Sequence, residues 1–172
     1  SFFICYLYAI LRAVNEIKEL TYRIEPDGRI VFYDSIDVLS PIRMKANGKF
    51  YTVRIPYNKS FDEFYKSAQT AIETIPDDGD PYAVEHAEAE KSSFGVVLVS
   101  AVPDLYFTAI VPTQKHKNGS DYPLITVGKA ILREGKIVMP ITLAVHHGFV
   151  DGFHITSFFR KVEHYLYQVG CM

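Results

Sequence analysis

The most informative stretch of the chain is Leu143-Ala-Val-His-His-Gly-Phe-Val-Asp-Gly-Phe-His154. It ends an apolar run with strand character (residues 137–145) and leads into a segment with the apolar spacing of a helix (residues 153–168). A polar turn between two apolar elements places its side chains at an element end, where a rigid scaffold can present them to a substrate. We therefore expect this turn to carry the chemistry of the protein.

Within this turn, His147 and Asp151 are the candidate catalytic pair. An imidazole titrates near neutral pH, so it can take a proton from a hydroxyl and return it within one turnover. Adjacent strand residues point to opposite faces, so only one of His146 and His147 can face a given cleft. Asp151 could pair with a basic side chain and brace the loop, or orient an imidazole directly. The alternative is a core histidine beside a helix-capping aspartate, because short motifs also match by chance.

The match extends beyond those two residues. The segment Val145-His-His-Gly-Phe-Val-Asp-Gly-Phe-His154 resembles the His-His-x-x-x-Asp-Gly-Phe-His signature of chloramphenicol acetyltransferases. The wider acyltransferase superfamily, which includes the dihydrolipoyl acyltransferase cores, shares only His-x-x-x-Asp-Gly, so the trailing Phe153-His154 points to the narrower family. Four further segments resemble family landmarks in the same order, at residues 8–15, 29–35, 100–103 and 123–129.

The composition is that of an ordinary globular protein. At 172 residues we expect one domain (1–172), and comparison with the family suggests that an N-terminal segment is lacking. A net charge of −2 gives no electrostatic footprint for nucleic acid or an anionic membrane, and no apolar run reaches membrane-spanning length. Residues 1–11 lack the basic start of a signal peptide. Cys5 is expected to be a small core residue, and Cys5 and Cys171 do not have the spacing of metal ligands. The two cysteines give no reason to expect a location outside the reducing cytoplasm.

Helical and hairpin signals alternate along the chain. Residues 2–20 have helical spacing, and Ser60 with Glu63 forms a capping box for a helix to about residue 75. Turn residues at 26–28, 46–49 and 134–135 separate alternating segments and predict three hairpins. Buried strands are expected at 95–100 and 105–111, a polar helix at 82–90, and a solvated basic loop at 115–117. Hairpins in series with helices on one side predict an α+β fold, a two-layer sandwich with a mixed, largely antiparallel sheet.

The resemblance implies an acetyl-CoA-dependent O-acetyltransferase with chloramphenicol or a similar small alcohol as acceptor, and hence a role in antibiotic resistance. His147 would remove the proton from the acceptor hydroxyl, whose oxygen would attack the acetyl-CoA thioester without an acyl-enzyme. Asp151 would support the loop structurally. Acetyl-CoA would be a co-substrate, with no bound cofactor. Family members are homotrimers with active sites between subunits, so the same assembly is expected here.

Two weaker site residues also follow from the resemblance. Thr126 would hold a water near the tetrahedral intermediate and Lys129 would lie near the 3′-phosphate of CoA, although both also fit ordinary strand positions. One departure stands out: Ala109 falls where the gapless count from Pro103 places an oxyanion-stabilising serine. Losing one such donor costs about 10²–10³ in rate.

Three alternatives accompany this interpretation. The chain could be a catalytically weak acyltransferase-like binding protein, as Ala109 would suggest, or an acyltransferase acting on another acceptor such as dihydrolipoamide. The third is a metal site formed by some of the histidines His146, His147, His154 and His164. Adjacent strand histidines diverge and no cysteine or carboxylate set completes such a site, so we expect no metal.

Overall fold

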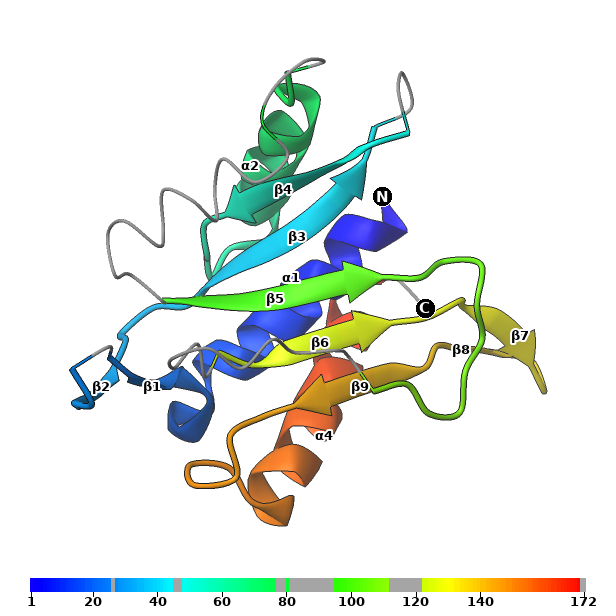
Figure 1. The fold of residues 1–172 in the computed structure, drawn as a ribbon. Coiled ribbons are helices and arrows are strands. Elements are labelled where there is room, and N and C mark those ends of the chain that lie inside the picture. The colour runs from blue at the N-terminus through cyan, green and yellow to red at the C-terminus, as the bar shows by residue number, and fades with distance from the viewer. Residues whose placement is uncertain (26, 45–47, 77–79, 81–94, 112–121, 171–172) are drawn as a thin grey trace.

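A five-stranded mixed sheet organises the chain (Figure 1), in the order β4-β3-β5-β6-β9. The computed structural model describes residues 1–25, 27–44, 48–76, 80, 95–111 and 122–170. The sheet strands are β3 (Asp37–Arg43), β4 (Phe50–Ile55), β5 (Val96–Ala101), β6 (Leu124–Val127) and β9 (Ile141–Ala144). Neighbours pair in parallel for β3–β5 and β5–β6 and antiparallel for β3–β4 and β6–β9.

Two short hairpins flank this sheet and are antiparallel, as predicted. Strand β1 (Tyr22–Ile24) pairs with β2 (Ile30–Phe32), and β7 (Ile131–Arg133) pairs with β8 (Lys136–Val138). In the second hairpin Glu134 and Gly135 both have positive φ, 51° and 76°, which is the geometry of a two-residue type I′ turn. The turn chemistry read from the sequence therefore identified all three hairpins.

Three helices cover one face of the sheet (Figure 1): α1 (Phe2–Asn15), α2 (Phe61–Glu73) and α4 (Gly152–Gln168). Helix α1 packs against α4, α2 and β3, and its residues Ile4 to Leu11 are all buried. Side chains from alternate strand positions, such as Val97, Val99, Ile125 and Val127, join it in one core. The expected α+β architecture, a mixed and largely antiparallel sheet with helices packed on it, is confirmed.

Three local expectations were only partly correct. The first helix ends at Asn15 and is followed by a 3-10 helix, η1 (Lys18–Thr21), rather than continuing to residue 20. Only half of the capping box forms, because the Ser60 hydroxyl accepts from the Glu63 N–H while the Glu63 carboxylate accepts from Asn58. Cys5 is buried as expected, but it is disulfide-bonded rather than a lone core thiol.

The strand expected at residues 105–111 does not form. The Leu105 N–H donates to the Val102 carbonyl in a turn, and the Leu105 carbonyl accepts from the Lys129 N–H. Only Phe107 in this segment is buried, whereas Val111 is 89% exposed. An apolar run forms a strand only where a neighbouring strand can pair with its backbone groups, so hydrophobic composition alone did not predict its structure.

The expectations for residues 82–90 and 115–117 lie outside the described residues. Within the described part of the chain, no helix has both the length and the hydrophobicity needed to cross a membrane.

Candidate active site

The histidine turn joins β9 to α4, where the sequence predicted it. The N–H groups of Phe149 and Val150 both donate to the His146 carbonyl, at 3.1 and 3.2 Å, and close the turn tightly. His147 lies at its tip with an exposed side chain. The turn therefore presents His147 to whatever approaches this end of the sheet.

The ring of His147 is held by one contact. Its Nδ1 lies 3.3 Å from the Val150 carbonyl oxygen. A carbonyl can only accept, so Nδ1 carries the hydrogen when this bond forms. The proton-free Nε2 then keeps its lone pair, which is the state that a general base requires.

His146 takes the opposite role. Its Nδ1 accepts from the Gly148 N–H at 3.2 Å, and its ring packs on Phe149 with centroids 4.9 Å apart. Phe149 in turn packs on Tyr22 of β1, 5.6 Å away between centroids. Because its Nδ1 is an acceptor in the turn and its ring is stacked, His146 braces the loop that presents His147.

Asp151 is the N-cap of α4. Its Oδ1 accepts from the Phe153 N–H at 2.9 Å and the His154 N–H at 3.3 Å. The backbone bond from His154 leads the causes that lower the pKa of the Asp151 carboxyl below its ordinary value, and the bond from Phe153 adds to it. These are the contacts of a helix-capping aspartate, the alternative considered for this residue, and its supporting role in catalysis stays a prediction.

His154 completes this cap and links it to the rest of the fold. Its Nδ1 lies 3.2 Å from the Asp151 N–H and 2.9 Å from Asp151 Oδ1. Its Nε2 lies 3.6 Å from Glu19 Oε1 in the 3-10 helix that follows α1. The sequence motif contained His154, but only the folded chain reveals its contact with Glu19.

A row of hydroxyls crosses the sheet on the face opposite the helices. Ser100 on β5 is the register partner of Thr126 on β6, and Thr126 is the partner of Thr142 on β9. Ile125 and Val127, which flank Thr126, belong to the helix-side core, so strand alternation points the three hydroxyls the other way. Sequence reasoning identified Thr126 and missed Ser100 and Thr142, because register across the sheet is not visible in a single sequence.

Lys129 and His147 lie at opposite ends of the β6–β9 strand pair. Lys129 follows Gly128, which comes after β6 and donates to the Pro140 carbonyl, whereas His147 follows the far end of β9, where Ala144 pairs with Leu124. The paired length of β9 alone separates these ends by about 10 Å. Lys129 is exposed. One chain therefore does not bring His147 and Lys129 together.

Ala109 lies outside the sheet, on an exposed position of the segment that was expected to be a strand. It has no register partner among the described strands, whereas Ser100 lies beside Thr126 within the sheet. Position 109 is therefore not part of the hydroxyl row.

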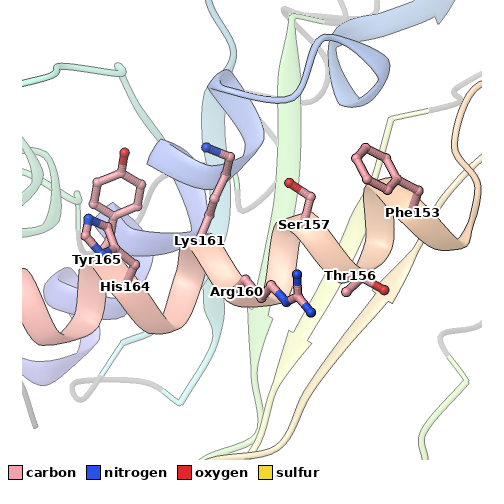
Figure 2. Close-up of a pocket in the computed structure, with 7 residues that line it drawn as sticks. All are labelled: Phe153, Thr156, Ser157, Arg160, Lys161, His164 and Tyr165. Atoms are coloured by element: carbon pink, nitrogen blue, oxygen red, sulfur yellow. The ribbon is translucent and has the colours of Figure 1, made fainter.

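A hollow of about 420 Å³ away from the histidine turn is lined by residues of α4 (Figure 2). Its basic side chains are Arg160, Lys161 and His164, but Lys161 already pairs with Glu16 at 2.8 Å. Glu16 also forms an ion pair with Arg12 at 2.7 Å and accepts a hydrogen bond from the Tyr165 hydroxyl. These contacts join α1 to α4. This charged group serves packing between the two helices, so the hollow is a weaker candidate site than the histidine turn.

Comparison with known proteins gives consistent matches. A sequence model of the chloramphenicol acetyltransferase family matches residues 1–163. A solved structure described as chloramphenicol acetyltransferase is 57% identical, with a TM-score of 0.92 over 96% of this chain and 78% of that one. Chloramphenicol acetyltransferases of Proteus mirabilis and Clostridium butyricum are 29% and 27% identical, over 99% and 95% of this chain and 75% and 72% of theirs.

Proposed function

The chain belongs to the chloramphenicol acetyltransferase family, and from this premise we propose that it transfers the acetyl group of acetyl-CoA to a hydroxyl of chloramphenicol or a similar small alcohol. The observation that carries the proposal is the geometry of His147. An exposed imidazole whose Nδ1 is bound to the Val150 carbonyl keeps Nε2 available to accept the acceptor's proton.

The reaction follows from this proton transfer. Nε2 of His147 takes the hydroxyl proton as the hydroxyl oxygen bonds to the thioester carbonyl carbon. The tetrahedral intermediate then collapses, the carbon–sulfur bond breaks, and the CoA sulfur leaves with the proton returned from His147. A thioester is already activated, so positioning of the base and stabilisation of the oxyanion supply the catalysis.

Ser100 and Thr126 are the proposed oxyanion-side groups. They are register partners on β5 and β6, and neither hydroxyl has a hydrogen-bond partner among the described residues. Thr126 is 7% exposed, so a donor there acts in a site with little competing water. Ser100 would donate to the oxyanion and Thr126 to the water or oxygen beside it.

The homotrimer is proposed from the family resemblance, which implies active sites between subunits. His147 and Lys129 lie at opposite ends of the β6–β9 pair, which agrees with an extended CoA whose thioester and 3′-phosphate are far apart. We propose a homotrimer in which His147 of one chain faces the hydroxyl row of the next, with Lys129 near the 3′-phosphate of CoA. A cytoplasmic location is proposed from the need for acetyl-CoA, although the disulfide at Cys5 is unusual in that reducing compartment.

Thiol release from acetyl-CoA, measured with and without chloramphenicol, tests the proposal. Wild-type protein should release CoA only with the acceptor, and His147→Ala should abolish that release. His146→Ala is the matched control, because it removes the adjacent imidazole and should retain part of the activity. If the protein binds CoA and His147→Ala leaves its turnover unchanged, the alternative of an acyltransferase-like binding protein is favoured. Acetyl transfer to dihydrolipoamide but not to chloramphenicol would favour dihydrolipoamide as the acceptor.

A further inference from the structure

Thr142 contains a buried hydroxyl that has no hydrogen-bond partner among the described residues. It lies on β9, and its Oγ1 is shielded from solvent without a hydrogen bond. Its neighbours on the same face of β9, Pro140 and Ala144, have no polar side-chain atom. Burying an unpaired hydroxyl destabilises a fold, so each such group in a protein calls for an explanation.

Thr126 is the polar side chain that faces Thr142 across the strands. The two residues are register partners of the antiparallel β6–β9 pair, and both point away from the helix-side core. Directly opposed residues have Cβ atoms about 4.5–5.5 Å apart, a distance at which two threonine hydroxyls can hydrogen-bond after rotation about χ1. Thr126 can therefore supply the missing partner.

We propose that Thr142 is a positioning residue that acts through Thr126. This rests on the proposed function: when Thr126 donates its hydroxyl hydrogen to the water or oxygen beside the oxyanion, its oxygen lone pairs become the acceptor for the Thr142 O–H. No proton is transferred between them. The second bond orients the Thr126 hydroxyl and polarises it, because hydrogen bonds in series strengthen one another in a low-dielectric site.

Loss of the Thr142 hydroxyl is expected to affect stability and turnover differently. The Thr142 hydroxyl has no partner within the described part of the chain, so replacing it with an isosteric methyl removes an unfavourable buried group. Thr142→Val should therefore keep or raise the melting temperature while lowering kcat. A threonine that merely fills space in the strand would show no loss of kcat on this change.

The experiment compares kcat, KM and melting temperature of Thr142→Val, Thr142→Ser, Thr126→Val and the Thr126→Val/Thr142→Val double variant. We expect kcat of Thr142→Val to fall about tenfold, the effect of one lost hydrogen bond, with KM for both substrates unchanged. Thr142→Ser should restore kcat. In the Thr126→Val background, Thr142→Val should cause no further loss, because the two groups act as one unit.

Thr21→Val is the matched control. Thr21 is also buried, but its hydroxyl donates to the Lys18 carbonyl at 2.9 Å, so its loss should lower the melting temperature and leave kcat unchanged. If Thr142→Val keeps the wild-type kcat while His147→Ala is inactive, only this inference is overturned and the proposed function stands. The same holds if the losses of the two single variants multiply in the double variant. Full turnover in His147→Ala would overturn the proposed function, and this inference with it.

Discussion

Ser100 on β5 lies directly beside Thr126 on β6, and strand alternation places both hydroxyls on the sheet face that the helices leave uncovered. Ala109, by contrast, lies on an exposed segment with no strand structure. These positions are the basis for proposing Ser100, rather than position 109, as the oxyanion donor.

Ser100→Ala should lower kcat by about 10² or more, because it removes a donor aimed at developing negative charge. Ala109→Ser should leave kcat unchanged, since its hydroxyl would face solvent on an exposed segment. Steady-state kinetics of the two variants decides between the positions. A rise in turnover for Ala109→Ser, with no loss for Ser100→Ala, would return the oxyanion role to position 109.

Asp151→Ala should lower the stability of the protein, because the first turn of α4 loses the acceptor for two N–H groups. Asp151→Asn should keep most of this stability, because asparagine caps helices nearly as well. Denaturant unfolding of both variants measures the difference. If Asn were as destabilising as Ala, the charge of Asp151 rather than its capping bonds would be what the fold needs.

The Asp151 cap also predicts a pH dependence. Its carboxyl pKa is lowered in the folded protein, chiefly by the backbone N–H of His154, so the stabilisation is present above the unfolded pKa and is lost as pH falls through the folded pKa. The melting-temperature gap between wild type and Asp151→Ala should therefore shrink below about pH 4. A gap that stays constant down to pH 2 would contradict this.

Gly128→Ala should be strongly destabilising. A Cβ there would lie 2.7 Å from Phe107, 2.7 Å from Pro140 and 2.8 Å from the Leu105 carbonyl oxygen, and that backbone atom cannot swing aside. Forcing such an overlap costs about 1–3 kcal/mol. Gly152→Ala is the control, because a Cβ at Gly152 meets nothing within 4 Å and alanine favours the helix. Equal stability of the two variants would show that residues 105–107 move to make room for the added methyl group.

Glu16→Gln should destabilise the contact between α1 and α4. Burial raises the pKa of the Glu16 carboxyl, but hydrogen bonds from Lys161 and Tyr165 and the nearby charge of Arg12 outweigh it and lower the pKa overall. The stabilisation is thus present at neutral pH and fades as pH falls below about 4. We expect a loss of about 1 kcal/mol at pH 7, modest because the group is partly solvated.

The matched control for Glu16→Gln is Asp27→Asn, which breaks the solvent-exposed 2.6 Å pair with Arg29. It should leave the melting temperature unchanged, because exposed ion pairs contribute little. Thermal unfolding at pH 7 and at acidic pH compares the two variants. Equal effects would mean that the bridge between α1 and α4 is no more important than a surface pair.

The sequence by itself determined the elements whose causes are local. Turn residues with positive φ specified the hairpins, the apolar spacing specified α4, and the histidine motif identified the turn before it. Asp151 also lies where local chemistry predicts a helix cap. Each of these depends on residues a few positions apart, which a linear reading contains.

The features that depend on residues far apart in the sequence were decided by the tertiary structure. The apolar run at 105–111 failed as a strand because no neighbouring strand pairs with it, and Ser100, Thr126 and Thr142 became one row only through register. The pairing of Glu16 with Lys161 brings together residues 145 positions apart. Packing and strand pairing are settled by the free energy of the whole fold, so the position of the hydroxyls relative to His147 could be known only once the sheet was assembled.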